Sequence, residues 1–142
     1  MVEVAKPEKV SSEDISVNKL LMKSILDDQR KAFYKEGFVS VETRVDRLNR
    51  AISVLKNYKK EFCSAMSEDF GHRSVHQSVL TDIGGSIASL QDASSRLKKW
   101  MRPQRRKSMF PIGYLGASST VEYQPLGVVG CISPWNFPLQ LA

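Results

Sequence analysis

The sequence contains only two cysteines and no long apolar stretch. No run approaches the roughly 18 apolar residues that a membrane-spanning helix needs. Residues 1–14 also lack the apolar core of a secretory signal. Because Cys63 and Cys131 cannot form a disulfide framework, we expect two reduced thiols in a soluble, cytoplasmic protein without a membrane partner.

Histidine is equally scarce, with two residues in the chain. His72 and His76 are four positions apart and could lie on one helix face. The glutamate of an H-E-x-x-H pattern is missing between them, and both cysteines are distant in the sequence. We therefore expect solvated or capping histidines and no metal ion.

Acidic residues are absent from residues 93–121, so the charge is unevenly distributed. The chain has 142 residues, with 21 Lys and Arg against 15 Asp and Glu, and its formal net charge is +6. The basic patch consists of Arg96, Lys98, Lys99, Arg102, Arg105, Arg106 and Lys107. Outside this patch the charges nearly cancel.

The basic patch allows two interpretations. It could bind nucleic acid, an anionic partner or the acidic surface of a second subunit. It could also be a solvated helix end, because cations are favourable at the negative end of the helix dipole. No nucleic-acid-binding motif accompanies the patch, so we favour the solvated helix end and expect no nucleic-acid partner.

The composition, with 42% hydrophobic and 25% charged residues, is typical of a globular protein. The polar residues 1–14 predict a disordered lead-in. Residues 15–103 carry apolar side chains at steps of three and four and predict amphipathic helices. These helices are expected at about 16–35, at 41–69 with a break at Asn57, and at 75–101.

Glycine and proline mark the expected ends of these helices. Gly37 and Gly71 are predicted stops, and Pro103 follows the third helix. Gly84 and Gly85 lie inside that helix, where each costs about 1 kcal/mol relative to alanine. We therefore expect close packing at these two glycines.

The pattern changes after Pro103. Residues 104–117 have no periodicity and predict an extended arm, and the alternation through 119–123 predicts an edge strand. The apolar run Val128–Ile132 predicts a strand covered on both faces, as in a parallel sheet. Parallel neighbours need crossovers of a dozen or more residues, which the ten residues after Ile132 cannot supply. We therefore expect the sequence to be cut from a longer α/β protein.

Residues 123–139 carry a specific motif, Y-Q-P-L-G-V-V-G-C-I-S-P-W-N-F-P-L. The motif resembles the first strand and turn of the nucleotide-binding domain in the aldehyde dehydrogenase superfamily, P-x-G-V-x-G-x-I-x-P-W-N-F-P. The helices from about Val17 and the Trp100–Pro103 helix exit are similar to the class 3 branch, and most of all to its bacterial coniferyl aldehyde dehydrogenases, which implies coniferyl aldehyde as one candidate substrate.

The resemblance implies an α/β fold that is mostly α in the residues present. An N-terminal helical segment would precede the first strands of an incomplete Rossmann-like domain. The expected division is a lead-in at 1–14, helices at 15–103, and an arm, an edge strand and the first nucleotide-domain strand at 104–142.

The resemblance also implies an enzyme that uses NAD or NADP to oxidise an aldehyde to a carboxylic acid. In the family, the residue that matches Asn136 stabilises the oxyanion formed when a cysteine thiolate attacks the aldehyde. Ile132, Ser133, Pro134 and Trp135 match positions that line the cofactor cleft. No G-x-G-x-x-G follows the expected strand, so the common dinucleotide fingerprint gives no support, but its absence does not count against a family that binds the pyrophosphate differently.

The chemistry of Asn136 supports this role independently. An amide at the carboxyl end of a parallel strand lies where α/β proteins bind ligands. Its NH₂ group is a neutral donor that can be directed at a developing oxyanion. A lone asparagine at a strand end is more often a turn or cap residue, and residues 132–135 could simply pack, but the flanking P-W and F-P favour the catalytic interpretation.

The family's nucleophilic cysteine and general-base glutamate match positions beyond Ala142, so the resemblance implies that this chain is inactive alone. Cys63 and Cys131 lie in an expected helix and strand, where a buried thiol is a poor nucleophile. The expected partners are an aldehyde substrate and further copies of the chain, bound through residues 104–124. The alternative is a non-catalytic helical interaction or oligomerisation module.

Overall fold

The computed structural model describes residues 12–142 and divides them into two units. One unit contains residues 12–37 and 126–129, and the other contains residues 38–125 and 130–142. The expected disordered lead-in falls largely outside the described residues, and residues 12–14 are helical rather than disordered.

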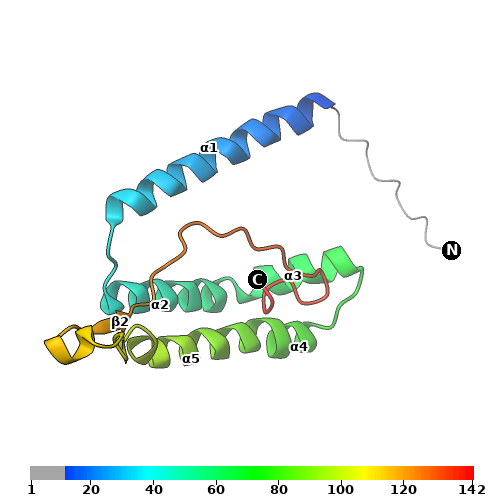
Figure 1. Cartoon of the computed structure of the whole chain (residues 1–142). Coiled ribbons are helices and arrows are strands. Elements are labelled where there is room, and N and C mark those ends of the chain that lie inside the picture. The colour runs from blue at the N-terminus through cyan, green and yellow to red at the C-terminus, as the bar shows by residue number, and fades with distance from the viewer. Residues whose placement is uncertain (1–11) are drawn as a thin grey trace. The chain divides into compact units, whose positions relative to one another are not determined.

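The first unit is built on one helix, α1 (Ser12–Glu36), shown in blue in Figure 1. Its end at Gly37 confirms the predicted stop, since Gly37 has a φ of 66° and donates its N–H to the Phe33 oxygen over 3.3 Å. A Cβ atom added at Gly127 would lie 3.5 Å from the ring of Phe33. That is an ordinary van der Waals distance, so the φ of 107° at Gly127, rather than crowding against α1, is what favours glycine there.

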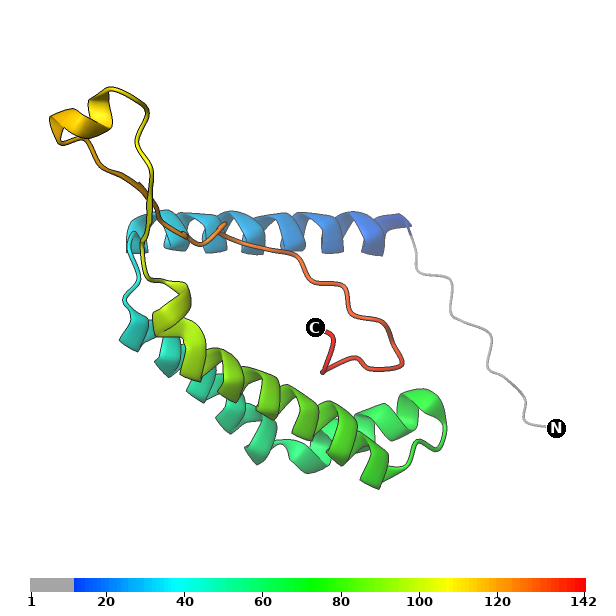
Figure 2. The same ribbon diagram turned by 60° about the horizontal axis from the view of Figure 1, so that its bottom comes forward.

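The second unit is a hairpin of two helical arms that lie side by side (Figures 1 and 2). One arm is α2 (Val41–Asn57) followed by α3 (Lys59–Phe70), so the predicted break at Asn57 is confirmed. The other arm contains α4 (Val75–Gln77), the π-helix η1 (Ser78–Gly84) and α5 (Gly85–Trp100). The helix α2 packs against α5.

Local hydrogen bonds define the ends of the helices in this hairpin. Ser40 caps α2, because its Oγ accepts the N–H of Thr43 over 3.2 Å. Hydrogen bonds from the backbone N–H of Glu42 and from Ser40 hold the pKa of the Glu42 carboxyl below its ordinary value, with a smaller contribution from the positive charge of Lys98. Gly71 ends α3 with a φ of 80°, which a residue with a side chain rarely adopts.

The core of the hairpin is small and partly polar. Its buried apolar side chains are Val39, Ile52, Cys63, Met66 and Ile83. Ser78, Asp82 and Ser86 are buried among the helices as well, and Asp82 is completely inaccessible. A buried carboxylate needs partners that replace the water it loses.

The second arm differs from the prediction of one regular helix between residues 75 and 101. Residues 78–84 form a π-helix, in which hydrogen bonds run from residue i to residue i+5. An ideal Cβ on Gly84 would lie 3.2 Å from the main-chain oxygen of Val79, which is a π-helical contact. A Cβ on Gly85 would lie 2.9 Å from the Gln140 side chain, so the expected close packing is confirmed at Gly85, whereas the close neighbour of Gly84 is the backbone of its own helix.

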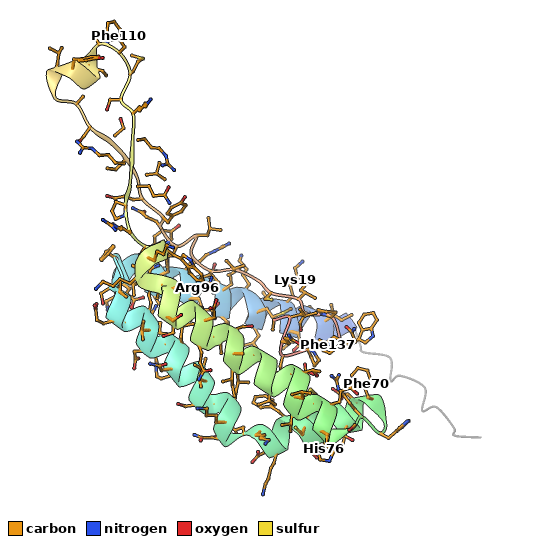
Figure 3. All side chains as sticks on the ribbon, turned by 90° about the horizontal axis from the view of Figure 1, so that it is seen from below. Lys19, Phe70, His76, Arg96, Phe110 and Phe137 are labelled. Carbon is orange, nitrogen blue, oxygen red and sulfur yellow. The ribbon has the colours of Figure 1, made fainter. Side chains whose placement is uncertain are left out.

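The arm after α5 is an antiparallel hairpin. The strand β1 (Gln104–Arg106) pairs with β2 (Ser119–Val121), and the 3₁₀ helix η2 (Ile112–Leu115) lies at its tip. Figure 3 shows Phe110 at this tip. The predicted strand near residue 119 is confirmed as β2, whereas β1 lies in a stretch that the sequence predicts to be irregular.

The structure differs from the sequence prediction at Val128–Ile132. No strand forms there, and Val129 and Ile132 are 70% and 99% exposed. The physical reason is that no strand among residues 12–142 is placed to pair with this segment, so its backbone and its β-branched side chains have nothing to cover them. The α/β fold class, mostly helical in these residues, is confirmed.

None of the helices formed by residues 12–142 is long and apolar enough to span a membrane.

Candidate functional site

The candidate site lies at the tight turn that follows Pro134. The N–H of Phe137 donates to the Pro134 oxygen over 3.3 Å, and the N–H of Leu141 donates to the Phe137 oxygen over 3.3 Å. Pro134 and Pro138 restrict the backbone on both sides of Phe137, because each proline ring fixes its own φ. The turn presents Asn136 next to the helical hairpin.

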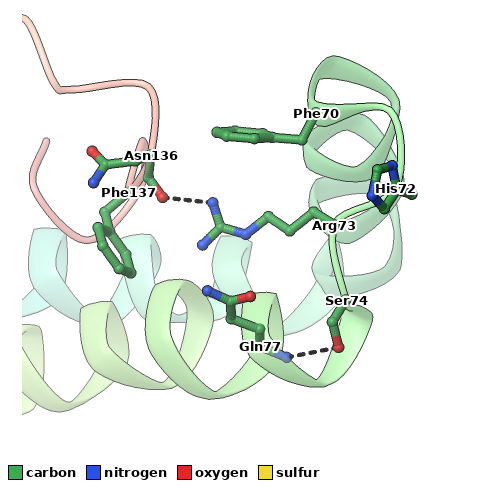
Figure 4. A pocket seen from close by; sticks show the side chains of 7 residues that line it. All are labelled: Phe70, His72, Arg73, Ser74, Gln77, Asn136 and Phe137. Atoms are coloured by element: carbon green, nitrogen blue, oxygen red, sulfur yellow. Dashed lines mark hydrogen bonds between the residues drawn. The ribbon is translucent and has the colours of Figure 1, made fainter. Parts of the chain in front are cut away.

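Arg73 connects this turn to the helices. It lies in the short loop between α3 and α4, and its side chain is only 5% exposed. Its Nη1 donates to the main-chain oxygen of Asn136 over 2.6 Å, as Figure 4 shows. Its Nη2 donates to Oδ2 of Asp82, also over 2.6 Å. One guanidinium therefore binds the turn and the π-helix simultaneously.

Asp82 is the second connection between the turn and the helices. Its Oδ1 accepts the main-chain N–H of Leu139 over 3.4 Å. Its Oδ2 accepts the hydroxyl of Thr81 over 3.2 Å in addition to the bond from Arg73. The single hydroxyl hydrogen of Thr81 is shared with the Gln77 oxygen at 2.8 Å, so Arg73 and Leu139 are the main donors that replace the water lost on burial.

Two aromatic rings flank the guanidinium. The Cζ atom of Arg73 lies 5.3 Å from the ring centroid of Phe70 and 5.5 Å from that of Phe137. Both distances fall within the range of cation–π attraction. A pocket of about 570 Å³ opens beside this group and is lined by Phe70, His72, Arg73, Ser74, Gln77, Asn136 and Phe137.

The side chain of Asn136 remains available within this arrangement. Arg73 binds the main-chain oxygen of Asn136, whereas the side-chain amide points away from Arg73 (Figure 4). The residue is exposed and lines the pocket. Its amide is therefore a neutral donor, on a backbone that is fixed at two points, that solvent or a ligand can reach.

The four residues expected to line a cofactor cleft precede Asn136 directly. Ile132 and Trp135 are 99% and 83% exposed, Pro134 is exposed, and Ser133 is half-buried. None of the four lines the pocket that contains Asn136. The structure therefore places them next to Asn136 along the chain, as an uncharged and largely apolar surface.

The two thiols differ from each other in accessibility. Cys63 is 4% exposed in α3, as expected for a small buried residue. Cys131 is exposed, so the expectation that it is buried in a strand is wrong. The cause is the missing strand at 128–132, which leaves the thiol uncovered.

The histidines do not share a helix. His72 lies in the loop before α4, lines the pocket and is exposed, while His76 is exposed on α4. Sequence reasoning also missed the contribution of Arg73 and Asp82. A signal was present for Asp82, because a charged residue three positions after Val79 falls on the apolar face of its helix.

A protein-family comparison identifies the class to which this chain belongs. The model described as "Aldehyde dehydrogenase family" matches residues 11–142. The chain therefore belongs to the aldehyde dehydrogenase family, a family of oxidoreductases that generally uses NAD(P) and aldehyde substrates and whose members often oligomerise.

Individual relatives narrow the similarity further. The chain is 50% identical over 119 residues to the coniferyl aldehyde dehydrogenase of Pseudomonas sp. (strain HR199 / DSM 7063). The aligned region covers 84% of this chain and 24% of the relative. It is 44% identical over 125 residues to a probable coniferyl aldehyde dehydrogenase of Caulobacter vibrioides, covering 87% of this chain and 26% of the relative.

A plant relative belongs to the class 3 branch. The chain is 30% identical over 122 residues to aldehyde dehydrogenase family 3 member H1 of Arabidopsis thaliana, covering 84% of this chain and 24% of the relative. The chain spans about a quarter of the length of the curated relatives that it matches.

Proposed function

We propose that this chain is part of an NAD(P)-dependent aldehyde dehydrogenase in which Asn136 stabilises the oxyanion. The relatives whose names specify coniferyl aldehyde support that aldehyde as the substrate. One observation carries the proposal: Arg73 holds the backbone of Asn136, while the side-chain amide of Asn136 stays accessible beside a pocket.

The physical requirement for an oxyanion donor is a group that is oriented before the reaction begins. When a thiolate attacks the aldehyde carbon, the carbonyl oxygen gains negative charge. An amide N–H already directed at that oxygen stabilises the charge without reorganisation and without exchanging a proton. The Asn136 NH₂ is such a donor, and the bond from Arg73 to the main-chain oxygen supports its orientation by restricting the backbone.

The uncharged surface before Asn136 supports a role in holding the cofactor. Ile132 and Trp135 expose nearly their whole side chains, and large exposed apolar groups commonly mark a binding surface. Such groups can pack against a planar ring and a ribose, while the Ser133 hydroxyl can donate or accept a hydrogen bond. The bound cofactor would accept a hydride. We propose that Ile132, Ser133, Pro134 and Trp135 hold it.

We further propose that the chain is inactive alone, because the family's nucleophile and general base have no match in it. Cys63 is buried and Cys131 is exposed, but neither matches the family's catalytic position. A test therefore needs the remainder of an enzyme. A chimera in which this chain replaces the matching quarter of the Pseudomonas coniferyl aldehyde dehydrogenase supplies it.

The test compares variants of this chimera with coniferyl aldehyde and NAD. We expect Asn136→Ala to lower kcat by about 10²–10³-fold, as observed when one oxyanion donor is removed. Cys131→Ser, the matched control in the same segment, should leave kcat unchanged. An Asn136→Ala chimera with full kcat, or a Cys131→Ser chimera without activity, would contradict the proposed roles.

A second function, assembly with further copies of the chain, is favoured by the tip of the arm. Four apolar side chains there are 74–86% exposed, namely Met109, Phe110, Tyr114 and Leu115, and Ile112 is 45% exposed. The rings of Phe110 and Tyr114 pack edge to face, 5.8 Å apart. Ser108 binds both Ala117 and Ser119, which fixes the base of the tip. An ordered apolar tip of this kind is typical of a contact surface.

Light scattering tests this second function. We expect the chimera to form an oligomer and the double variant Phe110→Ser, Tyr114→Ser to shift it towards monomers. Exchanging the exposed Leu80 on η1 for serine removes a comparable apolar side chain elsewhere and should leave the mass unchanged. An unchanged mass for the arm variant would exclude residues 104–124 as the contact.

A further inference from the structure

We propose that Arg73 and Asp82 are positioning residues that hold the Asn136 amide in its catalytic orientation. The inference rests on the proposed oxyanion role of Asn136 and extends it to a pair of residues that do not touch the substrate. The pair binds the turn on both sides of Phe137. Arg73 donates to the Asn136 oxygen, and Asp82 accepts the Leu139 N–H.

The bond from Arg73 is placed where it controls the direction of the Asn136 side chain. A 2.6 Å bond to the main-chain oxygen fixes the peptide unit between Asn136 and Phe137. Because that peptide plane is rigid, the direction of the Cα–Cβ bond of Asn136 is limited as well. The ψ torsion of Asn136 and its two side-chain torsions then direct its amide.

The bond from Asp82 supplies the second fixed point. Its Oδ1 accepts from Leu139, three positions after Asn136. Its Oδ2 binds the same guanidinium that holds Asn136. Both attachments therefore originate from one ion pair, and a rotation of the turn about either bond is opposed by the other.

Burial makes this ion pair rigid. The side chains of Arg73 and Asp82 are 5% and 0% exposed, and Phe70 and Phe137 lie against the guanidinium. Charge-assisted hydrogen bonds are short and directional, and shielding from water strengthens them. A lysine at position 73 would keep the charge but could not reproduce the planar, two-pronged donor geometry.

The chimera described above separates a positioning role from a purely structural one. We expect Arg73→Met to lower kcat by about 10²-fold, the effect of misplacing a catalytic group by about 1 Å, with the KM for aldehyde and for NAD unchanged. Arg73→Lys should fall between the wild type and Arg73→Met. The matched control Arg50→Met removes an arginine whose ion pair with Asp46 is exposed, and kcat should not change.

Asp82→Asn tests the other partner with a side chain of the same shape. If the new amide NH₂ group faces Arg73, two hydrogen-bond donors face each other, and the guanidinium is no longer held in position. We expect a fall in kcat similar to that of Arg73→Met. If the methionine variant does not fold, Asp82→Asn and Arg73→Lys provide the same comparison.

A double-mutant cycle gives the decisive readout. If Arg73 acts through Asn136, then Arg73→Met should cause no further loss of kcat in a chimera that already carries Asn136→Ala. Additive losses would overturn the proposal, because they would show that Arg73 acts independently. A full kcat for Asn136→Ala would instead overturn the proposed function itself.

Amide hydrogen exchange tests the same attachment without activity. In the 142-residue chain, Leu139 should exchange at least about tenfold faster in Arg73→Met and Asp82→Asn than in the wild type, because the turn opens more often. Arg50→Met should leave this rate unchanged. Equal exchange in all variants would show that the ion pair does not hold the turn.

Discussion

Arg73 and Asp82 form an ion pair of 2.6 Å in which both side chains are almost completely removed from water. Each partner also makes a hydrogen bond to the main chain of the turn that carries Asn136. The pair is therefore more than a link between the α3–α4 loop and the π-helix. Its loss should affect the stability of the chain as well as the geometry of the candidate site.

Removal of one member of this pair should strongly destabilise the chain. We expect Arg73→Met to lower the free energy of unfolding by about 3–5 kcal/mol, because Asp82 is left charged and buried. Arg50→Met breaks an exposed pair and should cost at most about 1 kcal/mol. Urea unfolding followed by circular dichroism measures both. Equal costs would show that burial of the Arg73 pair is not maintained in solution.

The two cysteines should react at different rates with a thiol reagent. Cys131 is exposed and should be modified in the native chain, whereas Cys63 should react only after unfolding. The reaction with an aromatic disulfide reagent measures the rates. Cys131→Ser should abolish the rapid phase, and Cys63→Ser should retain it. A rapid phase that persists in Cys131→Ser would contradict the burial of Cys63.

The start of α2 should contribute stability that depends on pH. The pKa of Glu42 is lowered in the folded chain, so its contribution is present above the unfolded pKa and is lost as the pH falls through the folded pKa. Ser40→Ala should raise the pKa of Glu42 towards its ordinary value and weaken this acid dependence. An NMR titration of the Glu42 carboxyl measures the change.

Ser40→Ala should also cost about 1 kcal/mol through the lost helix cap. Ser53→Ala is the control in the same helix, since its hydroxyl only binds the Asn49 oxygen one turn back. Ser53→Ala should leave the pKa of Glu42 unchanged. It should change the free energy of unfolding by at most about 0.5 kcal/mol. A shift of the Glu42 pKa in Ser53→Ala would show that the cap is not its cause.

The adjacent glycines of the second arm should respond differently to alanine. A Cβ on Gly85 would lie 2.9 Å from the end of the flexible Gln140 side chain, which can move. Gly85→Ala should therefore stabilise the helix by up to about 1 kcal/mol. A Cβ on Gly84 meets the Val79 oxygen at 3.2 Å, so Gly84→Ala should gain less. Denaturant unfolding tests this order, and a larger gain for Gly84→Ala would reverse it.

Much of the helical hairpin is predictable from the sequence. The break near Asn57, the stop at Gly71 and the end of α5 before Pro103 all follow from local signals that act over a few residues. The π-helix also left a signal. Val75, Val79, Ile83 and Ile87 recur at steps of four, which is wider than the 3.6 residues of an α-helical turn.

The remaining features depend on contacts between distant parts of the chain. The run Val128–Ile132 has the composition of a buried strand, but a strand forms only where another strand pairs with it. The position of Asp82 on an apolar stripe indicates that it needs a buried partner. Nothing local identifies Arg73 as that partner, or connects either residue to Asn136.

The attachment of the turn has a consequence for folding. Its bonds to Arg73 and Asp82 join residues 63 and 57 positions apart, whereas each helix forms through contacts within one turn. Long-range contacts form later, because the chain must first lose the entropy of closing a long loop. We therefore expect the helical hairpin to form first, and Asn136 to be among the last residues to dock and the first to be released.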